Sequence, residues 1–308
     1  MEHEPQRRLG AAKPRPRPAR WRPGRRARIA LLLAPALAVI TVLFLGGFAL
    51  AVAQSLGLLP LIGESRVSLD GYRAMIDDPA FRAGLGLTFR IALVATALSG
   101  VGAVAAALLV RGTRRGRRAV TWLFQFNLTV PHVVGAGAML LLLSQSGMVS
   151  RLAHAAGLTG SVRDFPQLVG GAGSVAIVAE YVWKGVPFVG IVVLAVLAAD
   201  VAPLEDVART LGAGPWQRLR HVVLPLVMPA VLSTSVLVFA FTFGAYEVPY
   251  LLGRSYPTTL PVVAFRAYTD VDLDARPEAM AICVVIALLV GALAFTYLRL
   301  LDHFARPS

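Results

Sequence analysis

The chain has 308 residues, of which 56% are hydrophobic and 15% charged, and its formal net charge is +13. Because soluble domains carry about 25% charged residues, this composition indicates a membrane protein. The single cysteine, Cys283, excludes a disulfide framework, a Cys-rich zinc site and an iron–sulfur cluster, and neither Lys13 nor Lys184 precedes the Ser or Thr of a G-x-x-x-x-G-K-[ST] phosphate loop. We therefore expect that the chain is not an enzyme, holds no cofactor and does not hydrolyse ATP.

The first 28 residues are rich in Arg and Pro and have no apolar face to bury. They are predicted to form a disordered cytoplasmic tail that anchors the topology, or that is attracted to anionic lipid headgroups. The sequence Ala51-Val52-Ala53 resembles a signal-peptidase site. The apolar run before it is longer than a signal peptide needs, so we expect residues 29–53 to remain as the first transmembrane helix.

Six apolar runs are long enough to cross a membrane as helices, which need about 20 residues. They are residues 29–53, 85–110, 119–143, 169–199, 224–246 and 279–298. The last five form a predicted core, 84–300, and residues 301–308 a second tail. The fourth run contains Glu180 and Lys184 and is expected to be broken at Pro187.

The orientation follows from the arginines beside these runs. With the N-terminus inside, the inner segments hold essentially the whole net charge of +13. Because cytoplasmic flanks retain positive charge, both termini are predicted to be cytoplasmic. This topology explains the basic composition without a nucleic-acid partner.

The predicted cytoplasmic connection at residues 203–225 is not polar throughout, as a passive loop would be. Leu204, Val207, Ala208 and Leu211 recur at helical spacing, which predicts a two-turn helix with one apolar face. Acidic residues, Glu205 and Asp206, occupy its first turn, where they favour the helix dipole.

A second short helix is predicted to begin at Pro215. Gly212 and Gly214 before it are expected to adopt positive φ and to reverse the chain. Trp216, Leu219 and Val222 give the second helix its own apolar edge. Such a hairpin in the cytosol predicts a partner protein with a groove for it.

These residues resemble the EAA loop of the permease subunits of bacterial binding-protein-dependent ABC importers, which reads E-A-A-x₃-G-x₉-I-x-L-P. The spacing is kept by the triplet 206–208, by Gly212, by Val222 and by the pair 224–225. The departures are Asp206 for Glu, Val207 for Ala and Val222 for Ile. The resemblance implies an all-α protein of the type I importer permease architecture with a cytoplasmic coupling-helix loop.

Several weaker matches extend this resemblance over about residues 85–300. They are Leu87-Thr88, Pro131, residues 183–188 and residues 225–229. Residues 241–253 and 256–266 look most similar to the spermidine/putrescine-type group. A small polar solute, polyamine-like in that group, is thus one expectation for the cargo.

The partners that the resemblance implies are ABC ATPase subunits, a second permease in a heterodimer, an extracytoplasmic solute-binding protein and membrane lipid, in the bacterial plasma membrane. The residues implied in ATPase coupling are Glu205, Asp206, Val207, Ala208, Leu211, Gly212, Ala213, Trp216, Leu224 and Pro225.

Polar residues inside the spans are candidates for a translocation path. Glu180 and Lys184 are four residues apart and are predicted to pair, as a structural pair or as a wall of the path. Glu247 between Tyr246 and Tyr250 could meet a cationic solute, or it could bond Arg90 or Arg254. Arg90 is expected to snorkel to the interface, and His132 and Cys283 to serve packing. No spacing of His, Asp or Glu predicts a metal site.

Two other functions compete with the importer hypothesis. An ion-coupled secondary transporter would use Glu180, Lys184 or Glu247 to carry the coupling ion, but it leaves the cytosolic hairpin unexplained. A membrane-anchored scaffold or nucleic-acid binder would use the basic tail, but it leaves five further spans without purpose.

Overall fold

The chain is helical wherever the structure describes it. The computed structural model describes residues 25–59, 64–111 and 113–305, and no strand occurs in these ranges. Six stretches are long and apolar enough to span a membrane, namely Ala27–Ser55, Pro79–Val110, His132–Ala155, Val175–Ala199, Pro215–Gly244 and Leu273–Tyr297. The prediction of an all-α protein with six transmembrane helices is thus confirmed.

The chain divides into two units, Met1–Phe48 and Ala49–Ser308. The described part of the first unit belongs to α1, Arg25–Ser55. This helix begins at Arg25, four residues before the predicted start, and its central residues are apolar on all sides, as a lipid-embedded helix requires. The remainder of the predicted tail, residues 1–24, lies outside the described residues.

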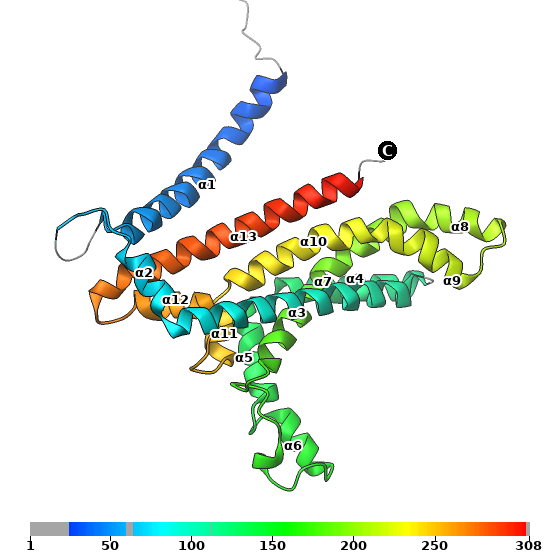
Figure 1. Cartoon of the computed structure of the whole chain (residues 1–308). Coiled ribbons are helices and arrows are strands. Elements are labelled where there is room, and N and C mark those ends of the chain that lie inside the picture. Colours follow the sequence, from blue (N-terminus) through cyan, green and yellow to red (C-terminus); the bar gives the residue numbers. More distant parts are fainter. Residues whose placement is uncertain (1–24, 60–63, 112, 306–308) are drawn as a thin grey trace, which may run out of the picture. The chain divides into compact units, whose positions relative to one another are not determined.

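The second unit contains the other helices (Figure 1). They are α2 Asp70–Asp77, α3 Pro79–Val110, α4 Arg114–Thr129, α5 His132–Leu143, α6 Met148–Ala155, α7 Val175–Val196, α8 Ala202–Thr210, α9 Pro215–Arg218, α10 Leu224–Gly244, α11 Glu247–Leu252, α12 Leu260–Tyr268 and α13 Arg276–Ala305. Two single π turns, η2 Leu197–Val201 and η3 Leu219–Val223, lie between α7 and α10. Short 3₁₀ turns occur at Val162–Asp164 and Leu273–Ala275.

The helices α3 and α7 form the centre of this unit. Side chains of α3 contribute to all three of its apolar clusters, and α7 packs against α3, α4, α5 and α10. The contact is close because small residues line it: a Cβ on Gly185 of α7 would lie 2.8 Å from the Cβ of Ser99 on α3. Small residues at helix contacts let backbones approach closely in a membrane, where dispersion contacts replace the hydrophobic effect.

The third predicted span is wrong as a single helix over residues 119–143. The chain ends α4 at Thr129, passes through an extended Val130 (φ −74°, ψ 125°) and starts α5 after Pro131. A residue before proline is pushed out of the helical region, which explains the break. The apolar helical stretch therefore runs over His132–Ala155 instead, because the first turns of α4 are basic.

The predicted break of the fourth span at Pro187 is also wrong, because α7 continues through this proline. Its predicted start at residue 169 is six residues early, since the helix begins at Val175. Proline is tolerated inside membrane helices when neighbouring helices hold the segment, and Pro187 is buried among them.

The last span begins earlier and ends later than predicted. Its helix α13 runs over Arg276–Ala305, so it enters the predicted tail, of which residues 306–308 lie outside the described residues.

The side chain of Thr88 ties α3 to α12. Its hydroxyl donates to the Gly84 carbonyl at 2.7 Å and accepts from the Leu260 N–H at 2.9 Å.

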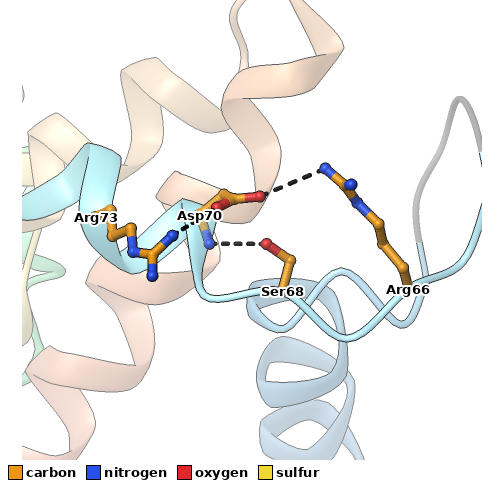
Figure 2. A network of polar contacts seen from close by, with 4 residues as sticks. All are labelled: Arg66, Ser68, Asp70 and Arg73. Carbon is orange, nitrogen blue, oxygen red and sulfur yellow. Dashed lines mark hydrogen bonds and ion pairs between the residues drawn. The ribbon is translucent and has the colours of Figure 1, made fainter.

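A polar network organises the segment that leads into α2 (Figure 2). Asp70 lies 3.5 Å from Arg66 and 3.4 Å from Arg73, and its backbone N–H donates to the Ser68 hydroxyl at 2.9 Å. The neighbouring Ser68 hydroxyl, and after it the two guanidinium groups, hold the pKa of Asp70 below its ordinary value. The three charged side chains are exposed, so they position the start of α2 rather than form a buried site.

Candidate functional site

The connection between α7 and α10 is helical along most of its length. After η2, α8 occupies Ala202–Thr210, close to the predicted two-turn helix. The expected second helix does begin at Pro215, but it is not separate. Because the backbone widens into the π turn η3 instead of ending, α9 continues into α10. The fifth span is therefore helical from Pro215, nine residues before the predicted start.

One of the two glycines in the turn behaves as predicted. Gly212 has φ +82°, and the N–H of the following Ala213 donates to the Ala208 carbonyl at 3.0 Å, as at a helix end closed by a left-handed glycine. The prediction for Gly214 is wrong, because its φ is −67°. Its N–H instead donates to Oε1 of Gln217 at 2.9 Å, which caps α9.

The hairpin of α8 and α9 exposes an apolar edge. Leu204, Val207, Leu211 and Trp216 have relative exposures of 49%, 55%, 82% and 67%. Ala208 and Ala213 are half-buried, as are Leu219 and Val222. Large apolar groups in such a row are unfavourable in water unless a partner covers them.

The predicted coupling residues Leu224 and Pro225 do not lie on this edge. They occupy the first turn of α10, where Leu224 is half-buried and Pro225 exposed. Their place follows from the continuous helix through η3, which moves them from the loop into the span.

Glu205 points inward, toward two arginines of this chain. Its Oε1 lies 3.5 Å from Nη2 of Arg111 and 3.3 Å from Nη1 of Arg218, and the three side chains are 15%, 28% and 14% exposed. Because Arg111 follows the end of α3 and Arg218 ends α9, this carboxylate links α8 to both helices. The neighbouring Asp206 is exposed and pairs only with Arg209 on its own helix, at 3.8 Å.

The sequence reasoning missed both arginine partners of Glu205. The position of Arg111 directly after the apolar run of α3 is a usable signal, because it marks the end of that span. Nothing in the sequence pairs it with a residue 94 positions later, since that contact depends on how α3 packs beside α8.

The predicted pair of Glu180 and Lys184 is wrong. The Lys184 ammonium instead donates to the carbonyl oxygens of Asn127 and Val130, at 2.8 and 2.6 Å. These carbonyls lie where α4 ends, and only that of Asn127 also accepts a backbone N–H there, from Val130 at 3.1 Å. Lys184 thus closes the break between α4 and α5.

Glu180 contacts a histidine that the sequence assigned to packing. Its Oε1 lies 3.0 Å from Nδ1 of His132, and its carboxylate is fully buried. The second oxygen of Glu180 has no hydrogen-bond partner among the described residues. His132 is therefore a polar partner of α7 rather than a packing residue.

A pocket of about 420 Å³ lies beside these groups, between α4, α5, α7 and α10. Its polar lining comes from His132, Tyr181, Lys184 and Thr242, while Leu128, Phe188, Leu237 and Phe241 supply apolar surface. The His132 ring lies 4.6 Å from that of Phe241. Glu180 supports this lining from behind through His132.

The other predicted path residues form a separate aromatic group at the start of α11. The rings of Tyr246 and Tyr250 lie 5.0 and 5.8 Å from Phe265 of α12. Glu247 beside them is exposed, and within the described ranges it forms no ion pair with Arg90 or Arg254. Arg90 donates instead to the Ala172 carbonyl at 2.9 Å.

Metal binding finds no support in the described part of the chain. None of its His, Cys, Asp and Glu residues gather in a group of three or more that could hold an ion. The lone Cys283 lies in α13 and is exposed on the surface of the chain.

Permease proteins of several transport systems resemble the chain, two of them over about three quarters of its length. The putrescine transport system permease PotI of Escherichia coli K12 is 29% identical over 226 residues, which are 73% of this chain and 74% of that protein. The molybdenum transport system permease ModB of Mycobacterium bovis is 28% identical over 236 residues, 75% of this chain and 86% of that protein. A protein named as a putative 2-aminoethylphosphonate transport system permease, PhnV of Salmonella typhimurium, is 40% identical over 89 residues, 29% of this chain and 33% of that protein.

Solved structures share the fold. A bacterial ABC transporter that imports the acidic polysaccharide alginate matches with a TM-score of 0.75 at 17% identity, over 91% of this chain and 96% of that one. The MetNI methionine transporter matches with a TM-score of 0.54 at 18% identity, over 72% of this chain and 95% of that one.

The family described as binding-protein-dependent transport system inner membrane component matches residues 98–307, which is more than half of the chain. This range contains the hairpin of α8 and α9 and the pocket between α4 and α10. The chain therefore belongs to this family of multi-pass permease subunits of ABC importers.

Proposed function

We propose that this chain, with a second and different permease subunit, forms the translocation path of an importer whose ATP is hydrolysed by separate ATPase subunits. An extracytoplasmic binding protein delivers a small polar solute to it. The observation that carries the proposal is the exposed apolar edge formed by Leu204, Val207, Leu211 and Trp216. We assign this edge to the ATPase subunit. The chain belongs to the importer family, so an ATPase subunit is the expected partner that would cover these apolar side chains.

The orientation in this proposal puts the hairpin and both termini in the cytoplasm of a bacterial plasma membrane. The arginines at 111–118 and those around the hairpin support it, because basic residues are retained on the cytoplasmic side. α6 and the hairpin lie at opposite ends of α7 (Figure 1), so α6 then faces outward toward the binding protein.

Movement of the ATPase reaches the spans by two routes in this scheme. The first is Glu205, which links α8 to Arg111 at the end of α3 and to Arg218 of α9. The second is the pair of π turns, η2 and η3, through which the hairpin joins α7 and α10. Single π turns in a helix often occur at functional sites and mark places where a span can change its winding.

We further propose that the pocket lined by His132, Lys184 and Phe241 is part of the path. Ionisable groups inside a membrane usually face a cavity, and this pocket gathers two of them beside aromatic rings. A polyamine-like solute remains an expectation from the sequence resemblance. No carboxylate belongs to the described lining, so a polyamine would depend on aromatic contacts there while facing the Lys184 ammonium.

An ion-coupled secondary transporter is less well supported. Two of the three groups that would carry its ion are engaged, because Glu180 contacts His132 and Lys184 donates to two backbone carbonyls. That function also leaves the exposed hairpin edge without a role.

The experiment that tests the proposal is co-purification of tagged Leu211→Asp from native membranes in mild detergent. We expect the wild-type chain to bring down an ATPase subunit, and the variant to lose most of it, because a carboxylate would be buried in the apolar contact. Leu158→Asp is the matched control, since Leu158 is 79% exposed and lies beyond α6, at the other end of α7.

Retention of the ATPase by Leu158→Asp and its loss from Leu211→Asp would support the coupling surface. An equal yield of ATPase with both variants would contradict it. Absence of an ATPase from the wild-type preparation would contradict the importer function itself.

A further inference from the structure

A second pocket, of about 400 Å³, lies under the hairpin. Its walls come from the end of α3, the start of α4, the end of α7 with η2, and α8 and α9. We propose that this pocket binds the phosphate group of an anionic ligand at the cytoplasmic surface. The site is distinct from the translocation pocket and from the exposed edge that we assign to the ATPase.

The charges of the lining favour an anion. Four arginines, Arg111, Arg117, Arg209 and Arg218, face two carboxylates, which leaves an excess of two positive charges. The carboxylate of Glu205 is shared between two of the arginines, at 3.3 and 3.5 Å. Among the side chains that the structure describes, none forms an ion pair with Arg117, and we assign the charge of this lining arginine to the ligand.

Two buried nitrogen atoms of the lining arginines also lack acceptors. Nη1 of Arg111 and Nε of Arg218 are buried without a hydrogen-bond partner among the described residues. A buried donor left unpaired is unfavourable, and such groups are rare in native proteins. A phosphate in the pocket would place acceptors beside these two arginines, whose side chains line it, and the planar guanidinium matches phosphate geometry in two parallel bonds.

The remaining wall of the pocket is apolar. Leu194, Leu197 and Val201 belong to the cytoplasmic end of α7 and to η2, next to the membrane. A phosphate carried by an anionic lipid of the cytoplasmic leaflet could therefore keep its glycerol and acyl carbons against this wall. A soluble phosphate would use the arginines alone. An acidic side chain of the ATPase fits less well, because the pocket lining is separate from the exposed apolar edge that we assign to the ATPase.

Ligand binding here would act on the link between α3 and the hairpin. The phosphate would sit beside Glu205 and between arginines of α3, α4, α8 and α9. Occupancy should then hold these four elements together, and the anionic lipid content of the membrane would set how firmly the hairpin is joined to the spans.

The test measures binding to the full chain purified in a non-ionic detergent, without any ATPase. The probes are inorganic phosphate and dihexanoyl phosphatidylglycerol. Dihexanoyl phosphatidylcholine and chloride at equal ionic strength are the controls. We expect the midpoint of thermal unfolding to rise with probe concentration, since a ligand that binds the folded state stabilises it.

The variants separate the site from general charge attraction. Arg117→Gln should weaken the apparent affinity roughly tenfold, which is the loss of one charge-assisted hydrogen bond. Arg118→Gln is the matched control, because Arg118 is exposed, follows Arg117 on α4 and does not line the pocket, so its affinity should stay within about twofold of wild type. Arg209→Gln, an exposed residue of the lining, replaces Arg117→Gln if that variant fails to fold.

Stabilisation by both probes would assign the site to phosphate in general, and stabilisation by phosphatidylglycerol alone would assign it to a lipid headgroup. No stabilisation by either probe, or equal affinities for Arg117→Gln and Arg118→Gln, would overturn the proposal. Unchanged probe binding in Arg117→Gln together with loss of ATPase co-purification would overturn it in favour of an ATPase carboxylate. The binding arm needs no ATPase, so its outcome is independent of the proposed importer function.

Discussion

The contact between α3 and α7 at Gly185 offers the sharpest test of the packing. A Cβ on Gly185 would lie 2.2 Å from Oγ of Ser99 and 2.8 Å from its Cβ. The hydroxyl can rotate away, but the Ser99 Cβ is fixed to the backbone. Gly185→Ala therefore forces α7 away from α3. Gly137 on α5 is the matched control, because a Cβ there would meet nothing within 4 Å.

The magnitude follows from comparing these two sites. An extra methyl group in a packed interior destabilises by about 1–3 kcal/mol. Replacing a helical glycine by alanine also stabilises the backbone by about 1 kcal/mol. Because that gain is common to both helical sites, the difference in free energy of unfolding between Gly185→Ala and Gly137→Ala isolates the steric term. We expect Gly185→Ala to be less stable than Gly137→Ala by about 1–3 kcal/mol.

The assay is unfolding of the purified chain in mixed detergent micelles, followed by tryptophan fluorescence. Ser99→Gly combined with Gly185→Ala removes the blocking Cβ, so a double-mutant cycle should return most of the lost stability as coupling energy. If Gly185→Ala is as stable as Gly137→Ala, or if Ser99→Gly returns none of the loss, the close approach of α3 and α7 is refuted.

Two further predictions concern ion pairs. Glu205→Gln should lower the free energy of unfolding by about 2 kcal/mol, since it leaves two partly buried guanidinium groups without a charged acceptor. Asp206→Asn, at an exposed site, should lower it by less than about 1 kcal/mol. Equal losses in the same micelle assay would contradict the inward role of Glu205. The pKa of Asp70 is lowered in the fold. Its contribution to the stability of the folded state is therefore complete above the ordinary carboxyl pKa of about 4, and it disappears as the pH falls through the lowered value. Hydrogen exchange of α2 should therefore accelerate over that acidic range relative to Asp70→Asn, and parallel pH profiles of the two proteins would argue against the network of Figure 2.

The apolar runs in the sequence predict the spans because a chain in lipid must satisfy its own backbone hydrogen bonds, and a helix does so locally. Run length and charge are thus enough to predict six helices. The hairpin is also visible in the sequence, because helical spacing from Leu204 to Leu211 and the glycine at 212 act over a few residues. These features lead to the importer family before any tertiary contact is known.

Prolines show where local reasoning ends. Pro131 separates two helices, while Pro187 lies inside one. The two residues have the same chemistry, but Pro187 is buried in a helix packed on several sides, whereas the break at Pro131 exposes carbonyls that Lys184 of another helix satisfies.

Tertiary structure alone decides the polar partners. Glu180 contacts His132 rather than Lys184, and Glu205 contacts Arg111 and Arg218 rather than a surface partner. Spacing on one helix predicts which side chains can meet, but it carries no information on acceptors from other helices. A buried charge takes the partner that satisfies it best in a medium without water, and that partner is determined by how distant segments pack together.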